Sequence, residues 1–97
     1  MPTYIGLLKF TDQGIRNVKE TTKRAKDLQD LAAKMNVKVR EIHWTMGRYD
    51  VVVVAEAPDD ETISRLTLGL GMLGNVTSET FRAFSASEMN QIVKGLP

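Results

Sequence analysis

The hydrophobic pattern begins with a strand and continues into a helix. Residues 3–10 are rich in aromatic and aliphatic side chains, and they stop at Thr11 and Asp12, residue types that favour the start of a helix. From Asp12 to Asn36 the apolar positions recur at helical spacing, which predicts one long amphipathic helix. Gly14 and the pair Thr21-Thr22 are weak points in this helix, where we expect an irregular turn or a kink.

The next two apolar segments predict a β-hairpin. Residues 37–46 and 49–57 are rich in β-branched and aromatic side chains, and only Gly47 and Arg48 lie between them. A two-residue connection with glycine first is typical of a type II′ turn. This turn pairs Trp44 with Val51 and His43 with Val52.

The remaining elements are a helix, a strand and a short terminal helix. Residues 58–61, Pro-Asp-Asp-Glu, place acids at a helix start, and the glycines at 69, 71 and 74 loosen and close that helix. Residues 76–84 predict the last strand. Ser85 and Glu88 have the spacing of a capping box, and Met89, Ile92 and Val93 follow in a short C-terminal helix.

The order β, α, β, β, α, β predicts a ferredoxin-like α+β fold with an antiparallel sheet and both long helices on one face. No linker, repeat or low-complexity segment interrupts residues 1–97, so we expect a single domain.

The predicted hairpin has two different faces. One face is assigned to the core under the helices, and it consists of Ile42, Trp44, Met46, Tyr49, Val51 and Val53. The opposite face consists of Glu41, His43, Thr45, Asp50, Val52, Val54 and Glu56. Residues 51–55 do not alternate apolar with polar, which indicates a strand covered on both sides. We therefore expect a homodimer or a higher homo-oligomer in which two sheets pack face to face.

Composition narrows the functional classes. The 97 residues are 42% hydrophobic and 26% charged, contain no cysteine, and carry a net charge of +1. This composition predicts a folded cytoplasmic protein without disulfides or thiolate metal sites, and neither the charge nor any apolar run favours a nucleic-acid or membrane partner. An RNA-binding sheet shares the predicted topology, but Val51 and Val53 occupy positions where stacking aromatic residues are expected.

His43 is the only histidine, which excludes a site with several imidazole ligands within one chain, and no metal site is predicted. With Asp50 from the adjacent strand, or with Glu41, it could form a catalytic proton-transfer group. The alternative is that these groups satisfy one another at a subunit interface.

Four further residues are candidates for ligand binding: Trp44, Arg48, Tyr49 and Arg82. Arg48 and Tyr49 lie at the hairpin tip, where they could bind an anionic group. Arg82 is a cation within a strand and needs a partner. Residues 69–74 match a GxGxxG string, but they end a helix instead of opening one, so no nucleotide cofactor is expected.

Three segments resemble the GYD domain family of small prokaryotic proteins. They are residues 4–14 (YIGLLKFTDQG), residues 47–50 (GRYD), and residues 74–76 together with 81–84. The family motif stands here as Gly47, Tyr49 and Asp50, with Arg48 inserted. The resemblance covers nearly the whole chain and implies a fold like that of the dimeric α/β-barrel proteins, a group that includes cofactor-independent monooxygenases, isomerases, haem-handling enzymes and ligand-sensing domains. No catalytic residue of those enzymes maps onto this sequence, and one fold hosts many functions.

Three functions remain open at this point. The first is a homo-oligomeric small-molecule-binding protein with a sensory or accessory role. Its pocket would lie between the sheet and the helices, near Trp44 and Tyr49, or inside a barrel formed by two sheets. The second is a monooxygenase or isomerase that needs no cofactor, with His43 or Asp50 as the base. The third is a purely structural oligomerisation module.

Overall fold

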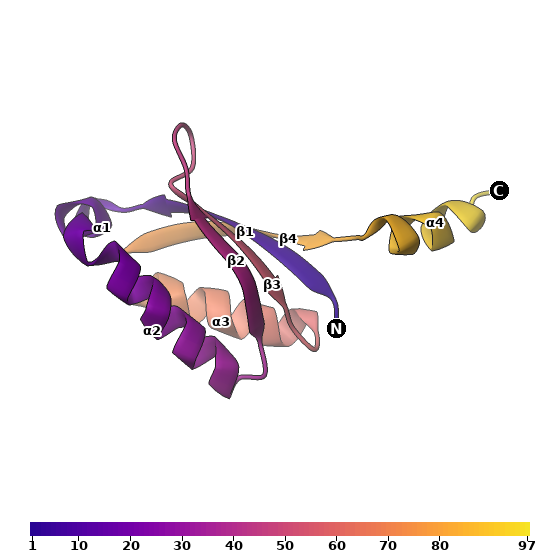
Figure 1. Ribbon diagram of the computed structural model, residues 1–97, viewed down its shortest axis with the longest axis horizontal. Coiled ribbons are helices and arrows are strands. Elements are labelled where there is room, and N and C mark those ends of the chain that lie inside the picture. Colours follow the sequence, from indigo (N-terminus) through magenta and orange to yellow (C-terminus); the bar gives the residue numbers. More distant parts are fainter.

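The computed structural model describes residues 1–97, and its elements follow the predicted order (Figure 1). They are β1 (Thr3–Phe10), α1 (Asp12–Arg16), the 3-10 turn η1 (Val18–Glu20), α2 (Thr21–Lys34), β2 (Lys38–Trp44), β3 (Val51–Glu56), α3 (Asp60–Met72), β4 (Val76–Ala83) and α4 (Ala86–Lys94).

The four strands form one antiparallel sheet in the order β2-β3-β1-β4. Helices α2 and α3 lie on the same face of this sheet, and the other face has no helix over it (Figure 1). The arrangement confirms the predicted ferredoxin-like α+β fold.

The predicted first helix is not continuous, because a break at Asn17 divides the segment into α1, η1 and α2. This break lies between the two expected weak points, Gly14 and the pair Thr21-Thr22. The start of α1 is tied to the turn before β4: the Thr11 N–H donates to the Asn75 carbonyl over 3.1 Å, and the Thr11 hydroxyl donates to the Gly74 carbonyl over 2.5 Å. Asn17 then leaves the helical conformation, with φ −105° and ψ 24°. This break lets α1 stay at the sheet end while α2 takes a new direction along β2.

The hairpin register is confirmed near the turn. Trp44 pairs with Val51 and His43 with Val52, and Gly47 has the positive φ of +100° that the turn prefers. The regular strands are shorter than predicted, because they end at Trp44 and resume at Val51. A bulge at Arg40 shifts the register farther along β2.

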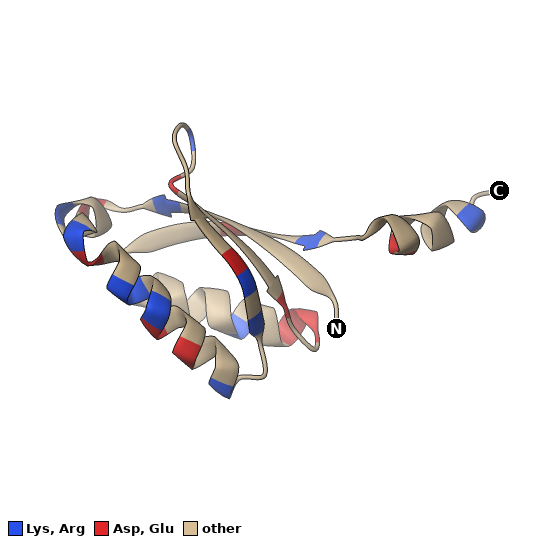
Figure 2. Cartoon of the chain, viewed as in Figure 1, with Lys and Arg blue, Asp and Glu red and all other residues tan.

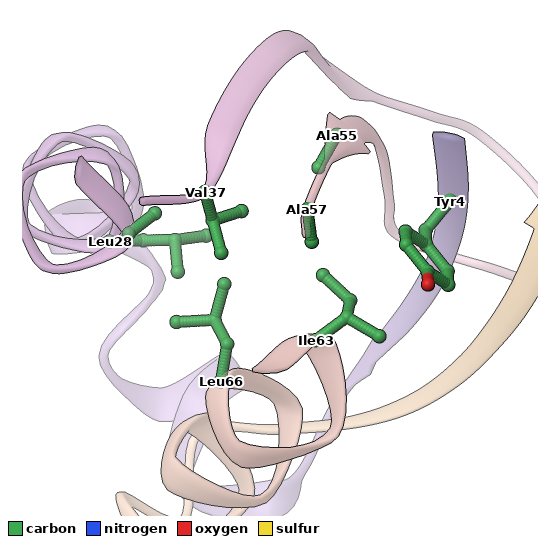
Figure 3. Packing of buried hydrophobic residues seen from close by; sticks show 8 residues of the cluster. Tyr4, Leu28, Val37, Ala55, Ala57, Ile63 and Leu66 are labelled. Atoms are coloured by element: carbon green, nitrogen blue, oxygen red, sulfur yellow. The ribbon is translucent and has the colours of Figure 1, made fainter. Parts of the chain in front are cut away.

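The hydrophobic core lies between the sheet and the two long helices, and Figure 3 shows its side chains converging from both layers. Its members are Tyr4, Leu28, Ala32, Val37, Ala55, Ala57, Ile63 and Leu66. Met46, which was predicted to belong to this face, is 98% exposed. That prediction is wrong because the hairpin tip projects away from α2 and α3 (Figure 1).

The short C-terminal helix is present as predicted, and it lies apart from the rest of the chain (Figure 1). Its first turn has the predicted capping box between Ser85 and Glu88. The radius of gyration is 14.6 Å, compared with about 12.5 Å expected for a compact domain of this length. The protruding helix accounts for this extended shape.

Candidate functional site

The uncovered face of the sheet is the largest candidate surface, and we call it the open face. Tyr4 and Leu8 on β1 are buried under the helices, so the alternate residues Ile5 and Leu7 point to the other side. The strand register extends this face to the neighbouring strands. Its apolar members are Ile5, Leu7, Val52, Val54 and Phe81, and its polar members include Lys9, Glu41, His43 and Glu79.

The open face is apolar in the middle and polar at its borders. Ile5, Leu7, Val52 and Val54 are only partly buried, and Phe81 remains 48% exposed. Apolar residues grouped on one surface and bordered by polar groups are typical of a protein interaction site. Residues 51–55, in which apolar residues do not alternate with polar ones, thus have one side covered by the helices and one side uncovered within a single chain.

Tyr49 lies on the open face, so its predicted place in the core is wrong. Its hydroxyl donates a hydrogen bond to the Glu79 carboxylate of β4. Glu79 pairs with Leu7, which places it on the open face. The contact connects the hairpin tip to β4. The hydrogen bond to this carboxylate raises the pKa of Tyr49 above its usual value.

We expect the phenol of Tyr49 to titrate above a free tyrosine, and Glu79→Gln to lower its pKa. The chain has two tyrosines, so a Tyr4→Phe background leaves Tyr49 as the only one. The hydrogen bond stabilises the neutral phenol in the folded state. Its contribution to the free energy of unfolding is therefore present at neutral pH and is lost as the pH rises through the raised pKa of Tyr49. Ultraviolet absorbance of tyrosinate during a pH titration measures the effect. An unchanged Tyr49 pKa in the Glu79→Gln variant would contradict the assigned contact.

His43 also lies on the open face, at its border. Its Nε2 is 3.1 Å from Oε1 of Glu41, and both side chains are more than half exposed. The structure therefore brings His43 together with Glu41 and not with Asp50. An imidazole beside a carboxylate can transfer protons, and such a pair can also bind a polar partner group.

Asp50 stabilises the base of the hairpin. Its Oδ2 accepts a hydrogen bond of 2.8 Å from the Phe10 N–H, and its own N–H donates to the Leu8 carbonyl over 2.8 Å. The three motif residues therefore have separate local roles: Gly47 forms the turn, Tyr49 binds Glu79, and Asp50 connects the hairpin to β1.

A groove lies on the other side of the sheet, between the sheet and helices α2 and α3. Its volume is about 390 Å³, and twelve of its sixteen lining residues are hydrophobic. Trp44 lies in its wall and donates an indole N–H hydrogen bond of 2.9 Å to the Thr21 hydroxyl. Arg24 and Asp27 also line the groove, so charged groups are available to a ligand.

The two predicted arginines lie away from this groove. Arg48 is exposed at the hairpin tip. Arg82 lies on the helix side of β4, with its guanidinium 5.9 Å from the centre of the Tyr4 ring and 5.1 Å from that of Phe84. The aromatic rings thus provide the partner that this cation needs.

The six predicted site residues are therefore divided between the two sides of the sheet and do not form one cluster. Trp44 and Arg82 lie on the helix side, while His43 and Tyr49 lie on the open face. No group of three His, Cys, Asp or Glu side chains is placed to hold a metal ion. None of the helices has the length and apolar character needed to cross a membrane.

The sequence interpretation missed the contributions of β1 and β4 to the open face, above all Phe81 and Glu79. The periodicity of β4 alone assigns its two sides but does not say which one faces the helices. The pairing of Ile5 with Phe81 decides this, and it is a contact between distant parts of the chain.

Comparisons with known proteins identify one matching family model and one similar protein. The family model described as GYD domain matches residues 4–93. The chain is also 33% identical over 90 residues to a protein of Thermus thermophilus named "Glutamine synthetase and cystathionine beta-lyase binding protein". That match covers 92% of this chain and 95% of the relative. No solved structure matches the chain significantly.

Proposed function

Because this chain belongs to the GYD domain family, we propose that it is a protein-binding accessory module that self-associates through the open face and docks on metabolic enzymes. The open face carries the proposal: it groups Ile5, Leu7, Val54 and Phe81 on a surface without helices. The name of the Thermus relative supports the second part, since that protein is named for binding two enzymes.

The composition of the open face favours the binding of a second copy of the chain. Two sheets packed face to face bury both apolar centres, and the polar borders remain in contact with water. Glu41 and His43 lie at the border, where a twofold arrangement brings the polar groups of one copy near those of the other. An assembly with two copies also presents two docking surfaces to an enzyme, which raises its avidity.

Sedimentation velocity at micromolar concentration tests self-association. We expect a mass of at least two 10.8 kDa chains, and we expect Val54→Asp to lower that mass at least twofold, because it buries a charge at the centre of the contact. Ala33→Asp on the exposed side of α2 is the control and leaves the mass unchanged. Phe81→Ser is a second variant at a more exposed position, in case Val54→Asp impairs folding.

A wild-type mass of one chain, or equal masses for the wild type and folded Val54→Asp and Phe81→Ser variants, overturns the proposed contact.

Enzyme docking is tested separately with purified glutamine synthetase and cystathionine beta-lyase from the organism that encodes this chain. We expect immobilised wild-type protein to capture at least one enzyme and Val54→Asp to capture it more weakly. Absence of binding to both enzymes overturns the accessory role.

The groove supports a second candidate function, the binding of a small apolar or aromatic molecule. Its volume lies in the range of small-molecule sites, and its walls are apolar with a few polar groups. Trp44 is the only tryptophan, so its fluorescence reports on occupancy directly. A metabolite screen is expected to find a compound that changes this emission and raises the melting temperature. A screen in which no compound changes either signal counts against this function.

Catalysis by His43 is a less favoured proposal, because the groove and His43 lie on opposite sides of the sheet. A monooxygenase or isomerase site would need the base and the substrate on the same side. The geometry of the open face thus favours binding.

A further inference from the structure

The C-terminal helix has an apolar side that nothing in the chain covers. Met89, Ile92 and Val93 lie on one side of α4, and they are 44%, 46% and 52% exposed. Figure 2 shows that the charges of α4 lie near its two ends, so its middle is uncharged. An isolated helix of nine residues is marginal in water, which indicates that α4 gains stability from packing on a partner surface.

The two edge strands of the sheet differ in a way that points to the same partner. The edge at β2 has a bulge and carries Lys38, Arg40 and Glu41, features that discourage pairing with another strand. The edge at β4 is eight residues long and pairs with β1 in regular register without a bulge. Its outer backbone groups are therefore available to a further strand.

A matching apolar surface lies on α3, next to the start of β4. Leu68 and Met72 are one turn apart on α3, and they are 70% and 87% exposed. The chain passes from Met72 through a short turn directly into β4 at Val76. The C-terminal end of α3 thus lies near the start of β4, whereas α4 follows the other end of β4 (Figure 1).

We propose that β4 pairs antiparallel with β4 of a second copy, and that each copy packs the apolar side of α4 on Leu68 and Met72 of the other. Antiparallel pairing places the end of one β4 beside the start of the other. The α4 of one copy then emerges next to the C-terminal half of the partner's α3. The exchange is reciprocal, so the contact closes as a twofold dimer.

The same chain offers α4 a poorer site. Only Phe84 and Ser85 separate β4 from α4, and two residues span at most about 7 Å. The nearest part of the same chain's α3 is its N-terminal half, because Tyr4 binds Asp60 there and also lies under Arg82. That half carries the ion pair between Glu61 and Arg65, with 3.3 Å between Oε2 and Nη2. A helix folded back would place its apolar side against these charges.

This interface is separate from the open face, so the proposal goes beyond the proposed function. The two contacts together build a tetramer in which each chain uses its open face once and its β4 edge once. Wild-type protein is then expected to sediment as four chains, and either Val54→Asp or Ile92→Asp as two. The double variant is expected to sediment as one chain.

Crosslinking tests the contact directly, because the chain has no cysteine of its own. Two single variants, Ile92→Cys and Met72→Cys, are made in a Val54→Asp background, mixed, and treated with a short bis-maleimide. We expect a species of twice 10.8 kDa from the mixture and none from either variant alone, since the two α4 helices lie at opposite ends of the dimer. Both substituted side chains are exposed, so folding is preserved.

The matched control replaces Ile92→Cys by Gln91→Cys, which lies on the opposite side of α4, and its crosslinking with Met72→Cys is expected to be several-fold weaker. A mixture that remains at the mass of one chain overturns the proposal. A chain carrying both Ile92→Cys and Met72→Cys that crosslinks only within itself also overturns it. If crosslinking fails while Val54→Asp still lowers the mass, only this inference falls; if crosslinking succeeds while Val54→Asp has no effect on the mass, only the open-face contact falls.

Discussion

Gly14→Ala is expected to destabilise the fold by about 3 kcal/mol, because there is no space for a methyl group at this position. A Cβ on Gly14 would lie 2.0 Å from the Asn75 carbonyl oxygen and 2.9 Å from its carbonyl carbon. Both are backbone atoms, and the same carbonyl already accepts the Thr11 N–H. Relief of the clash therefore requires α1 to move away from the turn before β4.

Thermal unfolding followed by circular dichroism measures this effect, and a loss of about 3 kcal/mol lowers the melting temperature by roughly 12 °C or more in a domain of this size. Gly69→Ala is the control, since a Cβ at Gly69 has no atom within 4 Å. Alanine is the better helix former, so this control is expected to stabilise the protein by up to about 0.8 kcal/mol. Equal melting temperatures for the two variants would show that α1 does not pack on Asn75 as described.

Leu66→Ala is expected to cost about 3 kcal/mol of unfolding free energy, because it opens a cavity in the core. Leu66 is 4% exposed and packs with Ile63, Val37 and Leu28 between the sheet and the helices (Figure 3). The core is small, with eight buried members, so the neighbouring side chains have little freedom to fill the space.

Leu31→Ala is the matched control, since Leu31 is also a helical leucine but is 42% exposed. We expect a loss of about 1 kcal/mol or less, because much of its surface already contacts water. Urea unfolding at low protein concentration measures both values without a contribution from self-association. A similar loss for both variants would contradict the assigned position of the core.

The element order and the hairpin register were predictable because both depend on local signals. The spacing of Trp44, Gly47 and Val51 within one hairpin sets which residues pair, and the capping pattern at Ser85 and Glu88 marks a helix start. The same locality explains why α3 and α4 were found where expected. Side-chain periodicity and turn chemistry act over a few residues, so the sequence itself carries this information.

The site was predicted only in part, because its contacts join distant segments. His43 was correctly placed on the face opposite the helices, but Asp50 was expected near it and instead binds the Phe10 N–H. Tyr49 was assigned to the core from strand alternation. Alternation fails at Tyr49 because regular pairing has already ended at Trp44 and Val51, and the phenol instead binds Glu79.

By itself, the sequence determined the fold class, the antiparallel hairpin and a sheet face left uncovered by the helices, since these follow from the order and period of its apolar residues. Only the tertiary structure decided that the first helix breaks at Asn17, that Tyr49 crosses to Glu79, and that α4 extends away from the body. Each of these depends on where β4 lies relative to residues far from it in the sequence. Such placement is decided by packing and hydrogen bonding in three dimensions, which local patterns do not encode.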